Sequence, residues 1–342
     1  MKRILAVNHF MYLERFEEPQ NTLYYAPVIN SAAQKAFFEK RFDSLKVRFP
    51  GIQWHPHNDE IEADVVLCWD AFDEKQRFGK KIYFGQNRLF DDLEFICPPS
   101  FSAFRRRAEK ELPSRFENPI QPFDPEVLYE LDYYFNQKRL AKTYFKTRNG
   151  MLGRNFSTKF SSFLSCGALD VRYLYNQVKE FEQEYGANKS TYWIVFELLW
   201  REFFYWHYQE VGTRFFSENG LDGYRNFSPI RRYSIQELHD RSHKVPFFQA
   251  ALNELTETGF LSNRTRQMFA SIWIHDLDLP WRSGADLFER YLIDYDVYSN
   301  WGNWMYLAGV GVDPRGSRYF NIDKQLSRYD PKNNYMRRWL AS

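Results

Sequence analysis

The feature that most restricts the fold is a change of pattern at about Leu140. From there to the end, apolar side chains recur three or four residues apart over long stretches, such as 170–184 and 191–209. This spacing is typical of helices that bury one face in a core. Pro246 can open a further helix over 247–258, and Gly259 suits its carboxyl end. The sequence therefore predicts an all-helical domain over 141–342.

Serines mark the expected starts of the other helices in this region. Ser190, Ser262 and Ser283 each stand just before a periodic segment, where a hydroxyl can accept a hydrogen bond from a free backbone N–H. We expect them to cap helices that run to about 209, 276 and 293, respectively.

The first hundred residues have a different pattern, with one helical stretch, 31–49, among short apolar runs. These runs are expected strands: 3–7, 63–68 and 81–84. Pro98-Pro99 then interrupts the pattern, and 98–140 is expected to be a linker with one helix. The predicted fold class is α+β overall, a small amino-terminal α/β layer over 1–97 followed by the all-α domain.

Composition excludes several classes of protein. A chain of 342 residues with 44% hydrophobic and 26% charged residues can form a full core and is not disordered. Three isolated cysteines supply neither a disulfide framework nor a four-thiolate cluster. No apolar run approaches the roughly 18 residues of a membrane span, and the start is too short for a secretory signal. We therefore expect a cytoplasmic protein that does not enter a membrane.

Aromatic residues make up 19% of the chain, with 10 Trp, 23 Tyr and 33 Phe. Such rings fill cores, but they also stack on flat cofactors and on bases. Residues 301–342 contain seven Lys or Arg against three Asp or Glu, a net charge of +4. A basic segment that is rich in rings suits a phosphate backbone, although a solvated face of mixed charge would look the same.

One constellation lies on the aromatic helix expected over 191–209. Trp193, Glu197, Trp200 and Arg201 fall at i, i+4, i+7 and i+8, so they share a face. They are either an exposed ion pair flanked by core tryptophans or one wall of a pocket for a flat, phosphate-bearing ligand.

Two other groups of polar residues are candidates for ligand contacts. The run 157–161 gathers three hydroxyls and a lysine, which suits an anion site but also ordinary helix capping. Asp294 and Asp296 could hold a hard cation, but the glycine and glutamate of a calcium loop are missing. We therefore expect no metal site, and instead a pairing of Arg266 with a buried aspartate.

Five stretches together resemble the photolyase/cryptochrome family, most closely its cryptochrome-DASH branch. The resemblance extends from about residue 98 to 340, and the stretches are TRNGMLG (147–153), STKFSSFL (157–164), STYWIVFELLWREFF (190–204), TGFLSNRTRQMFAS (258–271) and LIDYDVYSNWGNWMYLAGVGVDPR (292–315). Each stretch is weak alone, but their occurrence in this order is specific.

The resemblance implies an FAD cofactor that is active in its reduced form. The residues that it assigns to the cofactor, from the phosphate run to the isoalloxazine ring, are Tyr144, Ser157, Thr158, Lys159, Phe160, Ser161, Trp193, Arg201, Asn263, Arg266, Asp294, Asp296 and Asn300. In it, Arg201 matches a phosphate-side arginine, Asn300 faces N5 of the flavin, and Asp296 faces the pyrimidine edge.

The resemblance also implies contacts with a cyclobutane pyrimidine dimer. Glu197 and Trp200 match the acid and the aromatic wall that meet the lesion, and Gln267 and Tyr306 match two further contacts. Trp304 and Trp281 match the proximal and middle members of an electron-transfer tryptophan chain. With Glu197 and Asn300, these two tryptophans form the expected catalytic set.

The implied function is blue-light repair of these dimers, preferentially in single-stranded DNA, by a monomer. Two alternatives stay open: a photosensor that binds FAD without repair, and a flavin-bearing protein that binds single strands or RNA. The chain also departs from the family. Residues 1–97 are too few for the usual antenna domain, so we expect no antenna chromophore. Ser228 stands at the distal tryptophan position, and the loop 241–244 lacks the family's glycines.

Overall fold

The computed structural model describes residues 3–7, 22–25, 27, 29–55, 65–68, 82–84, 87–221, 227–311 and 316–340. The chain forms two compact units that alternate along the sequence. Unit 1 comprises 1–91, 113–142 and 158–191, and unit 2 comprises 92–112, 143–157 and 192–342. The division into 1–97, 98–140 and 141–342 stays a prediction, because compact units need not coincide with domains.

Unit 1 contains a parallel sheet of five strands in the order β3-β2-β1-β4-β5. The strands are β1 (Arg3–Val7), β2 (Thr22–Tyr25), β3 (Gln53–Trp54), β4 (Val65–Cys68) and β5 (Ile82–Phe84). Three of them were expected, although Ala63, Asp64 and Lys81 lie outside the described residues. The other two were missed, because four and two residues are too few for a period-2 pattern to be recognised.

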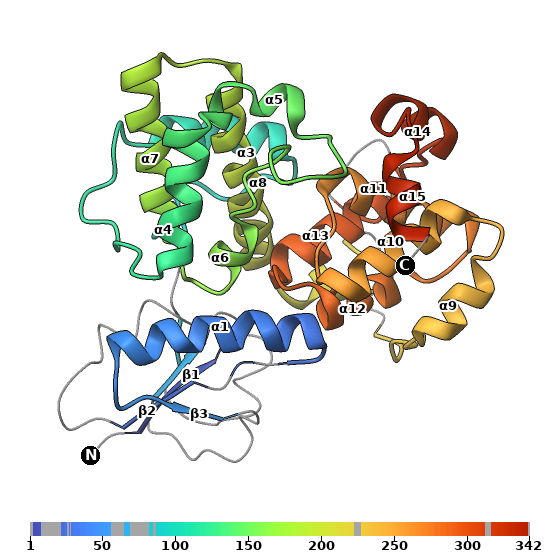
Figure 1. Cartoon of the computed structure of the whole chain (residues 1–342), viewed down its shortest axis with the longest axis horizontal. Coiled ribbons are helices and arrows are strands. Elements are labelled where there is room, and N and C mark those ends of the chain that lie inside the picture. The colour runs from blue at the N-terminus through green and yellow to red at the C-terminus, as the bar shows by residue number, and fades with distance from the viewer. Residues whose placement is uncertain are drawn as a thin grey trace. The chain divides into compact units, whose positions relative to one another are not determined.

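Helix α1 (Ala32–Arg48) joins β2 to β3 and lies across the sheet in Figure 1. Its start is fixed by a capping box, in which Ser31 and Gln34 each accept from the other's backbone N–H. Phe38 and Leu45 are buried on one face. On the same face Arg41, 1% exposed, pairs with Asp124, so the buried guanidinium has a counter-charge.

A buried amide, that of Asn87, bonds to the backbone of α6, of α7 and of the turn between them. Asn87 donates to the carbonyls of Leu164 at 3.0 Å and Leu169 at 2.8 Å, and accepts from the N–H of Val171 at 2.7 Å. The helical elements are α4 (Pro125–Asp132), the π-helical turn η3 (Tyr133–Gln137), the 3₁₀ turn η4 (Leu140–Lys142), α6 (Ser161–Ser165) and α7 (Val171–Tyr185).

The described residues of unit 2 form helices and no strands, and the all-helical character predicted for 141–342 is confirmed in the described part of that range. Its elements are α3 (Phe101–Glu111), α5 (Tyr144–Thr147), most of α8 (Lys189–Val211), the 3₁₀ turn η5 (Gly212–Phe216), α9 (Ile235–Arg241), α10 (Pro246–Thr258), α11 (Asn263–Ser271), the π-helical turn η6 (Ile272–Asp276), α12 (Trp281–Tyr291), α13 (Val297–Ala308), α14 (Ile322–Tyr329) and α15 (Asn334–Leu340). Helices α12 and α13 lie side by side, in orange in Figure 1.

Some helix ends differ from expectation. Ser262 caps α11 as predicted, and Gly259 ends α10 with a positive φ of 67°. The prediction that Ser190 caps α8 was wrong, because α8 begins at Lys189, before Ser190. The side chain of Asn188 accepts a hydrogen bond from the N–H of Ser190 at 2.7 Å instead. Ser283 was also wrong, because α12 already begins after Pro280. Ser283 is therefore the third residue of the helix and cannot cap it.

The segment 98–140 is more than a linker with one helix. It holds α3, α4 and the turn η3, and Phe104 in α3 is fully buried. Its many prolines suggested a linker, yet Pro125 stands at the first position of α4, where proline costs no hydrogen bond.

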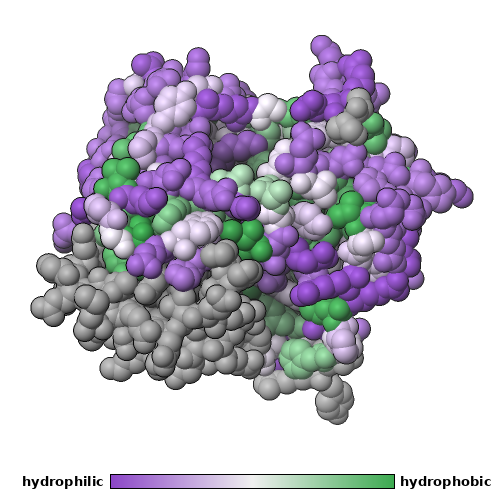
Figure 2. All heavy atoms as spheres, turned by 60° about the horizontal axis from the view of Figure 1, so that its bottom comes forward, coloured by the Kyte–Doolittle hydropathy of each residue, from purple (hydrophilic) through white to green (hydrophobic). Residues whose placement is uncertain are grey.

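Many of the aromatic residues whose burial the structure describes lie in the cores, including Trp273, Trp304 and Phe203. The face drawn in Figure 2 is largely hydrophilic over the described residues, with small separate hydrophobic areas. Among the described residues, no helix could cross a membrane, and no cluster of three or more His, Cys, Asp or Glu could bind a metal ion.

Candidate functional site

Glu197 lies in the middle of α8 and forms an ion pair with Arg148, which follows α5. Trp193, one turn earlier on α8, donates its indole N–H to the same oxygen, Oε1, at 3.1 Å. Within the described part of the chain, no side chain donates to Oε2. Burial raises the pKa of Glu197, and Arg148 and Trp193 oppose that rise. The carboxylate is thus held in place while one of its oxygens can meet a ligand.

Tyr144, at the start of α5, belongs to the same polar group. Its side chain is buried, and burial raises the pKa of its phenol, with Glu197 adding to the rise and Arg148 opposing it. The Arg148 guanidinium also lies 5.5 Å from the ring of Trp193, a cation–π contact. Arg148 therefore links three residues that the sequence assigned to cofactor and substrate.

Trp200 lies between two rings from distant parts of the chain. Phe101 of α3 stacks on it with centroids 3.7 Å apart, and Tyr306 of α13 meets it edge to face at 5.8 Å. Tyr306 in turn lies 4.5 Å from the guanidinium of Arg318. Because Glu197 is one turn from Trp200 on α8, a carboxylate and an aromatic wall occupy one stretch of unit 2.

Arg266 of α11 and Asp294 form the pairing that the sequence predicts. One guanidinium nitrogen donates to both carboxylate oxygens, at 2.9 and 2.8 Å, and Nε donates to the carbonyl of Leu261 at 2.9 Å. The Asp294 side chain is 2% exposed, whereas that of Arg266 is 26% exposed. The arginine can therefore face a ligand while the buried aspartate fixes its position.

Helix α13 presents three of the predicted residues at intervals of four. Asp296 caps the helix by accepting from the N–H of Ser299 at 2.8 Å, and Asn300 donates to the carbonyl of Ala285 at 3.0 Å. Trp304, one turn further on, is 2% exposed. Residues four apart share a face, so the order carboxylate, amide and indole follows directly from the helix.

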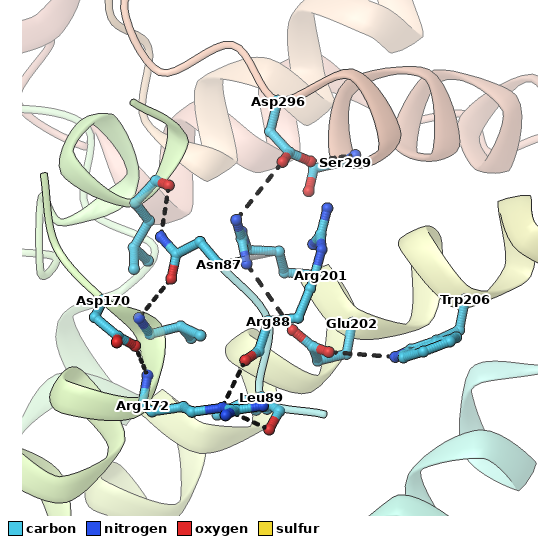
Figure 3. Close-up of polar contacts among 12 residues, drawn as sticks. Asn87, Arg88, Leu89, Asp170, Arg172, Arg201, Glu202, Trp206, Asp296 and Ser299 are labelled. Atoms are coloured by element: carbon cyan, nitrogen blue, oxygen red, sulfur yellow. Dashed lines mark hydrogen bonds and ion pairs between the residues drawn. The ribbon is translucent and has the colours of Figure 1, made fainter. Parts of the chain in front are cut away.

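Figure 3 shows the Arg201 side chain between Asp296 and Glu202. Its guanidinium nitrogens lie 3.8 Å from an oxygen of Asp296 and 3.9 Å from one of Glu202. Glu202 is in turn held by the indole of Trp206 at 3.3 Å. Arg201 thus reaches the beginning of α13 through Asp296, and two carboxylates partly balance its charge.

Trp304 and Trp281 occupy neighbouring helices. The ring of Trp304 lies against Gly284 of α12, where an added Cβ would come within 2.2 Å of it. Trp281 stands one turn before Gly284, and its indole N–H donates to the carbonyl of Glu218 at 2.9 Å. Glycine is required at position 284 because the indole fills the space of any side chain.

The predicted phosphate run is divided between the units. Ser157 belongs to unit 2, whereas the following residues, 158–161, belong to unit 1. In unit 1, Lys159 has a positive φ of 61°, and Phe160 is 1% exposed against Tyr134 and Phe135. The buried ring leaves Phe160 only its backbone for an anion, while Thr158 and Lys159 remain half-buried.

The remaining two predicted residues lie on α11. Asn263 is exposed at its first position and Gln267 is half-buried one turn later, near Arg266 in sequence. The structure therefore brings Tyr144 and Glu197 together around Arg148, and Trp200 and Tyr306 together through their rings. It also places Asp296, Asn300 and Trp304 at successive turns of α13.

This donor set fits a flavin. Asp294, Asp296 and Asn300 are all at most 9% exposed. Buried positions are usually apolar unless polar groups have partners, so this concentration of polar side chains suits a polar ligand. A guanidinium that is fixed but partly accessible can balance the negative charge of a reduced ring, and carboxylates and amides can meet its polar edge.

Sequence reasoning missed two residues of this site. Arg148 was part of a quoted stretch but had no role, and Phe101 fell in the expected linker. The local sequence around Arg148 and Phe101 contains no signal of a role in the site. Their partners, Glu197 and Trp200, are 49 and 99 residues away in sequence, respectively.

Comparisons with known proteins identify the family of this chain. Residues 193–342 match the family model described as the FAD binding domain of DNA photolyase. A protein named cryptochrome DASH from Idiomarina loihiensis is 42% identical over 306 residues, which are 87% of this chain and 67% of that protein. A cryptochrome DASH from Vibrio parahaemolyticus is 47% identical over 207 residues, 60% of this chain and 46% of its own length. The chain therefore spans about half of the length, or less, of several relatives named cryptochrome DASH.

Solved structures show the same relationship. A cryptochrome from Synechocystis superposes with a TM-score of 0.80 and 30% identity, over 100% of this chain and 88% of that one. A class III photolyase from Agrobacterium tumefaciens, with a TM-score of 0.66 and 17% identity, shares the fold over 100% of this chain and 87% of its own. The chain therefore belongs to the photolyase/cryptochrome family, with relatives named cryptochrome DASH, and contains the family's FAD-binding domain.

Proposed function

We propose that this protein uses blue light to repair cyclobutane pyrimidine dimers in DNA, preferentially in single strands. The observation that carries the proposal is the arrangement of Glu197, Trp200 and Tyr306. A fixed carboxylate with one available oxygen stands one turn from a tryptophan whose ring meets a tyrosine. Such a combination can hydrogen-bond one edge of a flipped pyrimidine dimer and stack on its face.

On the cofactor side, reduced FAD would supply the electron that splits the dimer when light excites it. Arg266, fixed by Asp294, would balance the negative charge of the reduced ring. Asn300 and Asp296 would meet its polar edge from the beginning of α13, and Arg201 would serve the phosphate side. Ser157, Thr158 and Lys159 would contribute hydroxyls, a backbone N–H and a cation to the phosphates.

On the substrate side, the charge of Glu197 matters. An ionised carboxylate only accepts hydrogen bonds, so it would accept a ring N–H of the lesion, whereas the protonated acid could donate to a ring carbonyl. Arg148 favours the ionised form and burial favours the protonated one. The residue can therefore change its hydrogen-bonding role as the electron arrives, with Gln267 and Tyr306 as further contacts.

Two features support a preference for single strands. A tyrosine at position 306 offers less stacking area than a tryptophan, so it would hold a flipped lesion less tightly. Flipping the lesion out of the helix costs a few kcal/mol in a duplex and least in a single strand. Weaker binding of the lesion is therefore sufficient in a single strand.

The test is repair of one thymine dimer in a single-stranded oligonucleotide, with the flavin chemically reduced beforehand. We expect light-dependent loss of the dimer in the wild type and a sharp fall in Glu197→Gln, while oligonucleotide binding persists. Glu257→Gln is a matched control, because that carboxylate is 50% exposed on α10. No repair by wild-type protein that holds reduced FAD would reject the proposal and favour a photosensor.

One observation favours the photosensor as a second candidate. Position 228, where the resemblance expects the distal tryptophan, holds a serine whose hydroxyl donates to Glu218 at 2.7 Å. A photosensor can tolerate a changed electron route to its flavin, because it does not have to pass an electron on to a substrate. The same assay separates the two, because a sensor would respond to light without removing the dimer.

A further inference from the structure

Two arginines share one carboxylate of α9, the helix drawn in yellow in Figure 1. Nη2 of Arg231 donates to Oε1 of Glu237 at 2.6 Å, and Nε of Arg241 donates to the same oxygen at 3.2 Å. Both guanidiniums also lie against the ring of Tyr233, with their carbons 4.6 and 5.5 Å from its centroid. One carboxylate therefore balances only one of these two positive charges.

A second pair of arginines shares a carboxylate of α12. The side chain of Asp286 is 8% exposed, and it accepts from Nε of Arg232 at 3.0 Å and from Nε of Arg290 at 2.9 Å. Nη2 of Arg290 also lies 3.5 Å from the carbonyl oxygen of Tyr233, which joins the two pairs. The four-arginine cluster is defined as Arg231, Arg232, Arg241 and Arg290, and with Glu237 and Asp286 it has a net charge of +2.

The guanidiniums of the cluster are held in place but still meet solvent. The side chains of Arg231, Arg232 and Arg241 are 59%, 72% and 41% exposed, respectively. Arg232 uses only Nε to bind Asp286, so its two terminal nitrogens have no hydrogen-bond partner among the described residues. Lys244, three residues after Arg241, is exposed as well. Ion pairs that only fastened α9 to α12 would need no excess of positive charge, which costs self-repulsion.

We propose that the four-arginine cluster binds phosphate groups of a DNA strand outside the lesion pocket, whether or not the strand is damaged. A guanidinium is planar, always charged, and can donate two parallel hydrogen bonds to one phosphate. Arginines that carboxylates already hold lose less side-chain freedom when a phosphate binds. The excess charge would release counterions from the strand, and this release drives binding that is independent of sequence. The inference rests on the proposed function only in taking DNA as the partner.

The cluster is distinct from the residues proposed to meet the lesion. Those residues lie on α8, α11 and α13, whereas the cluster belongs to α9, α12 and the segment before α9. Arg241 is also the first residue of the loop 241–244, where this chain lacks the family's glycines. A strand that binds the cluster would therefore add affinity without changing how a flipped dimer is held.

The experiment measures binding of an undamaged strand by FAD-loaded protein. Fluorescence anisotropy of a labelled single-stranded oligothymidylate is recorded over a series of salt concentrations. The double variant Arg231→Gln/Arg232→Gln should bind roughly twentyfold more weakly at about 0.1 M salt, because each phosphate contact in a single strand contributes about 0.7 to the slope of log K against log salt. Arg115→Gln is the control and should bind as the wild type, since that arginine is 60% exposed and pairs with Glu180 outside the cluster.

A variant of opposite sign separates phosphate binding from a purely structural role. Glu237→Gln removes a negative charge next to Arg231 and Arg241, so it should bind the strand more tightly than the wild type does. If the cluster only fastened α9, this variant would bind more weakly, and that result would overturn the inference. Binding by the double variant with the affinity and salt slope of the wild type, or an equal loss in Arg115→Gln, would overturn it too.

Two further measurements separate this inference from other outcomes. Polyglutamate should bind wild-type protein far more weakly than the oligothymidylate does; equal binding that the double variant loses would assign the cluster to an acidic protein instead. Repair of a thymine dimer in an isolated dinucleotide should be unchanged in the double variant, because a dinucleotide has no strand beyond the dimer. If no protein repairs the dimer but the double variant still loses binding of the undamaged strand, only the repair proposal fails.

Discussion

His207 of α8 is a buried histidine whose ring nitrogens have no hydrogen-bond partner among the described residues. The imidazole is 2% exposed and stacks on Phe203 with centroids 5.4 Å apart. Burial lowers the pKa of His207 to about 4, and the nearby charge of Arg214 adds to the effect. The folded protein therefore holds a neutral imidazole over a pH range in which the unfolded chain would protonate it.

The sign and size of the effect on stability follow from linkage. Between the unfolded pKa of about 6.5 and the folded pKa of about 4, the unfolded state binds more protons, so stability falls as pH falls. Each pKa unit corresponds to about 1.4 kcal/mol, so the full effect approaches about 3 kcal/mol below pH 4. Between about pH 7 and pH 4.5, this one group should remove about 2 kcal/mol of unfolding free energy.

The test is His207→Phe, which keeps an aromatic ring in the stack and removes the titratable group. Urea unfolding is followed by circular dichroism at pH 7 and at pH 4.5, and the change in unfolding free energy between them is compared with the wild type. Phenylalanine is larger, so a packing cost of about 1–3 kcal/mol can appear, but it would be equal at both pH values. His243→Gln, at an exposed position, is the control.

We expect the loss between the two pH values to be about 2 kcal/mol smaller in His207→Phe than in the wild type or the control. An equal loss in all three proteins would refute the reasoning. It would mean that the imidazole finds a partner or reaches water in the folded state, so that its pKa is not lowered.

Three further predictions concern the candidate site. Gly284→Ala should cost about 1–3 kcal/mol, visible in the urea midpoint, because the added methyl group would lie 2.2 Å from the Trp304 ring; an unchanged midpoint would contradict the close contact. Arg148→Gln should raise the pKa of Glu197 further, since burial then acts with less opposing charge, and isotope-edited infrared spectra should show the protonated acid at higher pH than in the wild type. Asp294→Asn should cost about 2 kcal/mol and lower the flavin-to-protein absorbance ratio after gel filtration, because a charged hydrogen-bonded pair is broken; wild-type flavin content would argue against a role for this pair in holding the cofactor.

Local sequence determined the helices and the faces that they present. The start of α11 at Ser262 and the end of α10 at Gly259 depend on side chains and backbone conformations within a few residues. The same is true of the spacing that puts Glu197 one turn from Trp200, because a helix converts sequence intervals directly into faces. The prediction that Arg266 pairs with a buried aspartate was also confirmed, because a charge in an interior requires a counter-charge.

Tertiary structure alone decided which side chains meet across the unit. Arg148 and Glu197 are 49 residues apart, and Phe101 and Trp200 are 99 apart, so no local pattern could pair them. The environment of Glu197, and with it the direction of its pKa shift, comes from these distant neighbours. Hydrogen bonds and ring contacts need atoms within a few ångströms, and only the packing of helices against one another brings residues that are distant in sequence to that separation.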